Sequence, residues 1–164
     1  MDETQITQIL AKLGFNSDYF VGVLPANQNI DRFIKQSATY GLIINTDNIG
    51  EPGTHWCAIH VGKNNTLYFF DSYGRHPKQL SNIWGTLKRF KNKKLVYSNI
   101  PIQSIISGNC GLYSIYFLFF MHYYLEDMSV FLQIFNHVNL DKNDDIINNL
   151  FEEILYVLNI DKIV

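Results

Sequence analysis

Apolar residues recur at helical spacing at the start of the chain, in the stretch "ETQITQILAKLG" (residues 3–14). The positions that fall on one helical face are Ile6, Ile9, Leu10 and Leu13. Gly14 comes directly after the last of them, where a helix often ends. The pattern therefore predicts a first helix over this stretch.

Runs of β-branched and aromatic residues follow in the middle of the chain. They are "YGLIINT" (40–46), "HWCAIHVG" (55–62) and "NTLYFFDSYG" (65–74), and each is typical of a β-strand. The polar stretch "GKNNT" between the last two predicts a hairpin loop, and a turn is expected where the last run ends in Ser-Tyr-Gly. The section before these runs, which includes "GVLPANQNI" (22–30), is predicted to be irregular.

The second half of the chain is predicted to be mainly helical. A weak helical pattern at 79–90 and a short strand at 94–100 precede an apolar helix at 112–124. Amphipathic helices are predicted at 128–138 and 143–160. The candidate N-caps are Asp127 or Ser129 for the first and Asp141 or Asn143 for the second.

Composition supports a single folded domain over residues 1–164. Hydrophobic residues make up 47% of the chain and charged residues only 17%, which is far from the composition of a disordered chain. The length suffices to bury roughly 70% of the unfolded surface in one core. Together with the predicted elements, this indicates an α+β fold: a central, mostly antiparallel sheet flanked by helices.

Charge and patterning exclude several classes of protein. A net charge of -2 argues against nucleic-acid binding by the whole surface, and leaves "KRFKNKK" (88–94) as the one candidate contact. The start "MDETQITQ" lacks the pattern of a secretion signal, and the apolar stretch at 112–124 is too short to span a bilayer. The 2 cysteines cannot form a disulfide framework. We therefore expect an intracellular protein that is not secreted and has no membrane partner.

Cys110 is the first candidate for chemistry, because it stands in "SIISGNCGLYSIYFLFF" (104–120) where an apolar helix begins. The unpaired N–H groups at a helix N-terminus favour a thiolate, and the neighbouring glycines allow a substrate to approach the backbone closely. A buried, unreactive cysteine at the head of a core helix is the alternative, and free cysteines are commonly buried.

Further residues could complete a thiol active site. His55 opens a predicted strand beside a glycine-rich turn, and a histidine there could act as a base. Asp71 ends an apolar strand, where its carboxylate needs a partner such as an imidazole N–H or a backbone turn. Gln103 precedes Cys110 by a glycine turn, and its amide could donate to an oxyanion.

Cys57 competes with Cys110 as the cysteine of a site. On a strand, His55 and Cys57 point to the same face, so they could form a dyad or half of a metal site. Further ligands at suitable spacing are missing, and parallel side chains on one strand do not converge as a nucleophile and base must. We therefore expect Cys57 to be a packed apolar residue and expect no metal.

Three segments, read in order, resemble a known family. "GTHWCAIHV", "LYFFDSYG" and "PIQSIISGNCGLYSIYFL" are similar to the adenovirus protease (adenain) family and, more distantly, to the SUMO-specific cysteine proteases. Both use the order His, Asp or Glu, Gln, Cys. The likeness covers about residues 1–125, and the helices over 127–164 would then be an addition specific to this lineage.

The resemblance implies a role for each candidate residue. His55 would be the base, Asp71 its orienting carboxylate, Gln103 the oxyanion donor and Cys110 the nucleophile. Adenain usually has Glu where this chain has Asp71, and the SUMO-specific proteases have Asp. Trp56 would cover a narrow groove that binds small substrate residues.

The function that the resemblance implies is that of a cysteine endopeptidase, viral or virus-like, which cleaves virion precursor proteins after Gly-containing motifs. An isopeptidase that removes modifiers ending in Gly-Gly is an alternative with the same chemistry. A catalytically silent copy of the fold, used for structure or binding, is an alternative from another class. The presence of His55, Asp71, Gln103 and Cys110 together argues against this last one.

The resemblance also bears on partners. Adenain is activated by DNA and by a viral peptide that is disulfide-linked to the enzyme. This chain has no cysteine between Trp84 and Gln103, so a peptide activator would bind without a disulfide. No cofactor is required, and DNA would have to use the basic segment 88–94. We expect a monomer that is packaged in a virion or acts in the host cytoplasm or nucleus.

Overall fold

The computed structural model describes residues 1–34, 38–63 and 65–157. Its strands are β1 (Phe20–Leu24), β2 (Tyr40–Asn45), β3 (Trp56–Val61), β4 (Thr66–Phe70) and β5 (Lys94–Tyr97). Its α-helices are α1 (Glu3–Lys12), α2 (Ser81–Leu87), α3 (Cys110–Tyr123), α4 (Met128–Leu132) and α5 (Lys142–Val157). The short 3₁₀ helices are η1 (Asp31–Phe33) and η2 (Pro77–Gln79).

The strands form one sheet in the order β1-β2-β3-β4-β5. The central strand β3 pairs antiparallel with β2 and β4, whereas the outer pairs, β1 with β2 and β4 with β5, are parallel. The predicted α+β fold, with a sheet flanked by helices, is confirmed. The prediction of a mostly antiparallel sheet is corrected in one respect, because the parallel outer pairs make the sheet mixed.

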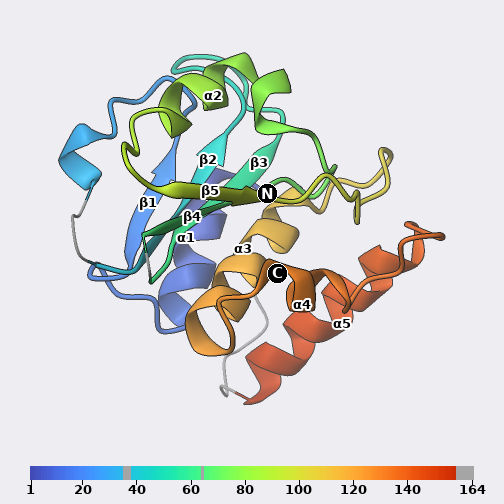
Figure 1. The fold of residues 1–164 in the computed structure, drawn as a ribbon. Coiled ribbons are helices and arrows are strands. Elements are labelled where there is room, and N and C mark those ends of the chain that lie inside the picture. The colour runs from blue at the N-terminus through green and yellow to red at the C-terminus, as the bar shows by residue number, and fades with distance from the viewer. Residues whose placement is uncertain (35–37, 64, 158–164) are drawn as a thin grey trace.

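Helices cover both faces of the sheet (Figure 1). One core joins α1, α3, α4 and α5 to one face, and a second core joins α2 to the other. Every residue of β2 and nearly every residue of β3 is therefore buried. Burial on both faces explains why these strands are continuous apolar runs without polar alternation.

Strand β1 lies partly in the section 22–30 for which the sequence predicts irregular structure, so that prediction is wrong there. The strand is short, and its parallel register with β2 shifts between Phe20 and Val23. Gly22, at φ 145°, lies within this irregularity, and Pro25 follows the strand directly. Both residues normally argue against a strand, and the pairing with β2 overrides that local preference.

The helix predicted over 128–138 is shorter than expected, because α4 ends at Leu132. The side-chain oxygen of Asn136 accepts hydrogen bonds from the backbone N–H groups of Val138 and Asn139, at 2.8 Å each. These bonds offer the backbone an alternative to the helix. The spacing of apolar residues, from which the longer helix is predicted, carries no information about these side-chain hydrogen bonds.

Helix caps agree with the sequence where the structure describes them. Asp127 caps α4, since its carboxylate accepts from the backbone N–H groups of Ser129 and Val130. Gly14 follows α1 at φ 83°, a conformation that favours glycine. The predicted end of the last helix, at Ile160, lies outside the described residues.

Three chain segments bring candidate site residues to one end of the sheet. His55 directly precedes β3, Asp71 directly follows β4, and Cys110 is the first residue of α3. Helix α3 is buried along most of its length, and its Ser114 hydroxyl donates to the carbonyl of Trp56 at 3.2 Å. The packing of α3 against β3 therefore fixes where Cys110 lies relative to the strand ends.

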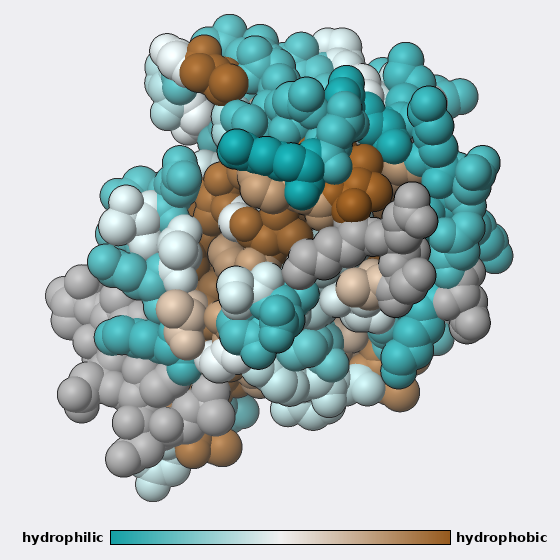
Figure 2. Space-filling view, turned by 90° about the vertical axis from the view of Figure 1, so that its left-hand side faces the viewer, coloured by the Kyte–Doolittle hydropathy of each residue, from teal (hydrophilic) through white to brown (hydrophobic). Residues whose placement is uncertain are grey.

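The surface seen from the side of β1 carries a central group of apolar residues, with polar residues above it and to its left in the view (Figure 2). Within the described part of the chain, no helix combines the length and the apolar character needed to cross a membrane.

Candidate active site

A buried histidine and a buried aspartate meet at the end of the sheet. Nε2 of His55 lies 2.7 Å from Oδ1 of Asp71. The two residues are only 4% and 1% exposed. The antiparallel register of β3 and β4 brings the residue before one strand and the residue after the other to the same edge. The carboxylate therefore fixes the orientation of the imidazole.

Asp71 uses both of its carboxylate oxygens. Oδ1 also accepts from the backbone N–H of Tyr73 at 3.0 Å, and Oδ2 accepts from Nε of Arg75 at 2.7 Å. Burial raises the pKa of Asp71, but the hydrogen bonds and charges of His55 and Arg75 outweigh burial and hold this pKa below its ordinary value. The carboxylate is thus ionised at neutral pH.

The imidazole of His55 is held on its face as well as at its edge. The Tyr73 ring stacks on it, with ring centroids 4.5 Å apart and an interplanar angle of 24°. Burial lowers the pKa of His55, but Asp71 and Cys110 outweigh it, so the pKa is raised overall. Nδ1 has no hydrogen bond of ordinary geometry among the described residues, whereas Nε2 is bonded to Asp71. Nδ1 is therefore the nitrogen left to exchange a proton with the thiol.

Cys110 combines burial with stabilisation of its charged form. It is 9% exposed and has no disulfide partner. Burial raises the pKa of its thiol, but His55 and the backbone N–H groups of Trp56 and Gly111 outweigh burial and lower the pKa overall. Such an environment favours a thiolate at the start of a helix.

Gln103 is held in a fixed orientation near the chain that leads to Cys110. Its Oε1 accepts from the Ser72 hydroxyl at 2.5 Å. Its Nε2 donates to the Ser107 carbonyl at 2.9 Å and to the Ser107 hydroxyl oxygen at 3.2 Å. The structure thus brings His55, Asp71 and Cys110 together, whereas the side-chain hydrogen bonds of Gln103 go to Ser72 and Ser107.

Cys57 lies close to the same residues but in a different environment. It is fully buried, and one ligand atom each of His55, Cys57 and Asp71 lie within 4.8 Å of one another. Burial raises the pKa of Cys57 well above its ordinary value, and the charge of Asp71 adds to this. The cation of Arg75 contacts Asp71, and a metal ion at this position would meet a positive charge and a carboxylate already in use. The donor set therefore fits a metal poorly.

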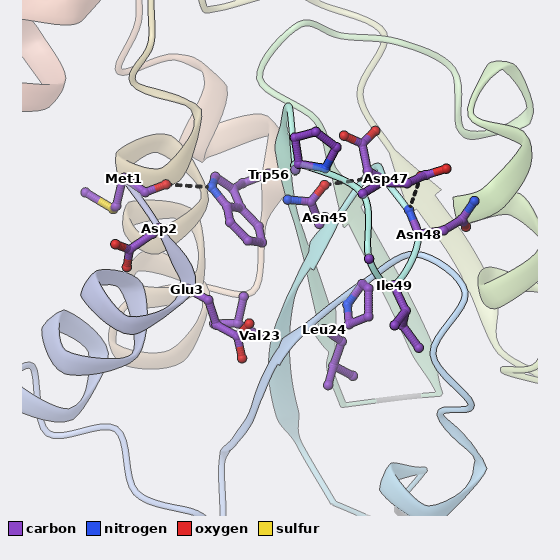
Figure 3. Close-up of a pocket in the computed structure, with 15 residues that line it drawn as sticks. Met1, Asp2, Glu3, Val23, Leu24, Asn45, Asp47, Asn48, Ile49 and Trp56 are labelled. Atoms are coloured by element: carbon purple, nitrogen blue, oxygen red, sulfur yellow. Dashed lines mark hydrogen bonds between the residues drawn. The ribbon is translucent and has the colours of Figure 1, made fainter.

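Trp56 lines a cavity of about 400 Å³ beside the start of β3. Its indole N–H donates to the carbonyl of Met1 at 3.1 Å, so the N-terminal residues form one wall of the cavity (Figure 3). The end of β2, with Asn45, and the loop that follows it, with Asp47, form the opposite wall (Figure 3). Gly111, next to Cys110, lies close to Met1: a Cβ atom at position 111 would be only 2.9 Å from the Met1 sulfur.

The basic segment 88–94 follows α2 directly and ends at the first residue of the edge strand β5. Arg89 is paired with Asp31, and Nζ of Lys93 donates to Asn65 at 3.1 Å. Two of the basic side chains of this segment therefore already bind partners within the protein. Contact with DNA at this segment stays a prediction.

Sequence reasoning missed several residues of this site. Tyr73 and Arg75 follow Asp71 in the same short segment, and an aromatic and a cation so close to a buried carboxylate could have indicated partners for it. Ser107 and Asp144 join the surroundings of Gln103 through hydrogen bonds across the fold. No local pattern links these two, since Ser107 lies in the loop before α3 and Asp144 lies in α5.

Comparisons with known proteins place the chain in a family context. The model of a protein family described as adenovirus endoprotease matches residues 20–162. A protein of Acanthamoeba polyphaga mimivirus named as a thiol protease is 31% identical over 118 residues, which cover 60% of this chain and 39% of that protein. A protease of Ovine adenovirus D serotype 7 is 23% identical over 138 residues, which cover 77% of this chain and 67% of that protein.

A solved structure is also similar. The crystal structure of an ASFV protease aligns with a TM-score of 0.43 and 22% identity, over 69% of this chain and 42% of that chain. This chain thus spans less than half the length of both the mimivirus protein and the ASFV protein.

Proposed function

The chain belongs to the adenovirus endoprotease family, and we propose on this premise that it is a cysteine endopeptidase that cleaves viral precursor proteins. The observation that carries the proposal is the buried arrangement of His55 between Asp71 and Cys110, with the pKa of the thiol lowered and that of the imidazole raised. A thiolate paired with an imidazolium is the state in which a thiol protease attacks its substrate.

The first half of the proposed reaction transfers the acyl group to sulfur. The Cys110 proton resides on Nδ1 of His55, and the thiolate attacks the carbonyl carbon of the scissile bond to form a C–S bond. The electron pair of the carbonyl moves to oxygen, which the Gln103 amide and the backbone N–H of Cys110 would stabilise. As the C–N bond breaks, His55 gives its proton to the leaving amine.

The second half releases the product from the thioester. A water molecule gives a proton to His55 and attacks the thioester carbon, and the C–S bond breaks. The proton then returns from His55 to the Cys110 sulfur. Asp71 holds the His55 imidazole in the same orientation through both halves, because its two carboxylate oxygens stay bonded to His55 and Arg75.

Substrate choice is proposed to favour small residues before the scissile bond, of the Gly-Gly or Gly-X kind. Trp56, which follows His55 in the chain, is hydrogen-bonded to Met1, and Met1 lies against Gly111, which follows Cys110. A substrate without bulky side chains next to the scissile bond would suit a site crowded in this way. The substrates themselves would be virion proteins, by analogy with the family.

The test uses purified protein and peptides with an internal Gly-Gly or Gly-X motif, with and without prior alkylation of the thiols. We expect cleavage that alkylation abolishes. Incubation with a Gly-Gly-linked ubiquitin-like conjugate distinguishes an isopeptidase, which would cleave the conjugate in preference to the peptides. A wild-type protein that cleaves none of these, even with added DNA or candidate activating peptides, contradicts the proposed function.

A further inference from the structure

The segment between Gln103 and Cys110 is tied to the C-terminal helix α5. The hydroxyl of Ser107 donates to Oδ1 of Asp144, the third residue of α5, at 2.7 Å. Nδ2 of the neighbouring Asn143, which is fully buried, donates to the carbonyl of Ile102 at 2.8 Å. The start of α5 therefore holds this segment on both sides of Gln103 in the chain.

Asp144 fixes how the Ser107 hydroxyl points. A carboxylate only accepts hydrogen bonds, so the single hydroxyl hydrogen of Ser107 is directed at Asp144. The lone pairs of Ser107 Oγ then face the two donors around it, Nε2 of Gln103 at 3.2 Å and the backbone N–H of Asn109 at 3.2 Å. Asp144 thereby determines which group receives the second amide hydrogen of Gln103.

The remaining bonds of Gln103 leave its amide little freedom. Oε1 accepts from Ser72, and one Nε2 hydrogen is used by the Ser107 carbonyl. The second Nε2 hydrogen makes the longer bond, to the neutral hydroxyl oxygen of Ser107, so it is the one that can change to another acceptor. A negatively charged oxygen is the stronger acceptor and would draw it away from Ser107.

We propose that Asp144 is a positioning residue for the oxyanion donor, acting through Ser107 to hold the Gln103 amide ready for the developing negative charge. The inference rests on the proposed function, because it needs a reaction that forms an oxyanion. It extends the catalytic apparatus to α5, a helix outside the segments that carry the family motifs. Tyr113 of α3 supports the same carboxylate, with its hydroxyl 3.1 Å from Oδ1 of Asp144.

The experiment compares Asp144→Ala with Asp145→Ala, a matched loss of a carboxylate from an exposed neighbour on the same helix. Peptide cleavage gives kcat and KM, and iodoacetamide alkylation of Cys110 reports on the thiolate alone, because alkylation forms no oxyanion. We expect Asp144→Ala to lower kcat about tenfold. This is less than the loss of roughly 100-fold or more that follows removal of an oxyanion donor, because the Gln103 amide is still present. KM and the alkylation rate should stay within about twofold of wild type.

Two more variants separate positioning from a general structural role. Ser107→Ala breaks the same connection from its other end and should lower kcat to a similar extent. In a Gln103→Ala background, Asp144→Ala should have no further effect on kcat, because the residue through which it acts is gone. The side-chain amide signals of Gln103 in NMR spectra should shift in Asp144→Ala and not in Asp145→Ala.

Clear results would overturn the inference. Equal kcat in Asp144→Ala and Asp145→Ala, a gain in kcat, or a parallel loss of alkylation would each contradict positioning through Gln103. Full additivity with Gln103→Ala would do the same. If the wild type cleaved no peptide at all, the proposed function would fail first, and the inference would fail with it.

Discussion

The two cysteines of the chain show how little burial alone says about reactivity. Cys57 and Cys110 are both free and buried, at 0% and 9% exposure. Both also lie near the charged pair of His55 and Asp71. Yet the pKa of Cys57 is raised well above its ordinary value, and that of Cys110 is lowered.

The difference comes from what faces each sulfur. Cys57 lies within β3, with the carboxylate of Asp71 as a nearby like charge and an apolar core around it. Cys110 begins α3, and its thiolate is stabilised by the imidazole of His55, which precedes β3, and by the backbone N–H groups of Trp56 in β3 and Gly111 in α3. A reactive thiol therefore needs donors that converge on it from separate elements, and an inert one lacks them.

The largest effect is expected from removing the reactive thiol. Cys110→Ala should lower peptide cleavage at least 1,000-fold, on the order of losses seen when a catalytic nucleophile is removed. The measurement is kcat/KM on a Gly-Gly peptide. Retention of more than a few per cent of wild-type activity would show that Cys57, or no cysteine, is the nucleophile.

The next effect concerns the oxyanion donor. Gln103→Ala should lower kcat by roughly 100- to 1,000-fold, since one donor to the developing charge is lost. The rate of Cys110 alkylation should stay the same, because the thiol does not depend on the amide. A proportional fall in both rates would mean instead that Gln103 supports the structure of the site.

A smaller change is expected in the rate of Cys110 alkylation when the imidazole is removed. In His55→Ala the pKa of Cys110 should rise, because burial is then opposed only by the backbone N–H groups. The alkylation profile of Cys110 against pH should move to higher pH, and the rate at pH 6 should fall about tenfold for each pH unit that the profile moves. Cys57 serves as the internal reference, and its profile should move far less.

Asp71→Asn removes the charge that holds the imidazolium. The raised pKa of His55 should fall, so the alkaline limb of kcat against pH should move to lower pH. Because the pKa of Asp71 is lowered in the folded protein, its ionised form stabilises the wild type above about pH 4, and this stabilisation is lost as pH falls further. Asp71→Asn should lack this acid-dependent loss, which unfolding by urea at pH 3 and pH 6 would measure. An unchanged alkaline limb would contradict the role of Asp71.

The smallest effect on activity is expected at the inert cysteine. Cys57→Ala should leave kcat/KM within about twofold of wild type and reduce the free energy of unfolding by about 1 kcal/mol, as is common for a core substitution. Peptide cleavage and urea unfolding measure the two quantities. A large loss of cleavage without loss of stability would give Cys57 a part in the reaction.

Much of the fold could be predicted because local patterns and packing agree. The resemblance to the adenovirus protease family is confirmed, as are the strands at 40–46 and 55–62 and the start of the last helix. Strand β1 is missed, because its pairing partner β2 is distant in sequence and Gly22 interrupts its pattern.

The residues of the candidate site also fall into two groups, those that the sequence indicates and those that it does not. Cys110 and His55 carry signals in their flanking turns, and the structure brings them together with Asp71. Ser107 and Asp144, in contrast, are joined by a hydrogen bond that depends on how the loop before α3 meets α5. Such contacts have no signature within a short stretch of sequence, so only the folded chain reveals them.

The most direct test of the central claim is the alkylation of both cysteines by iodoacetamide at pH 6, with mass spectrometry to identify the modified residue. The account predicts that Cys110 reacts at least tenfold faster than Cys57, because the pKa of its thiol is lowered whereas that of Cys57 is raised, so that more of Cys110 is thiolate at any given pH. Equal rates, or faster modification of Cys57 in the folded protein, would contradict the claim that His55 and the start of α3 hold Cys110 as a thiolate.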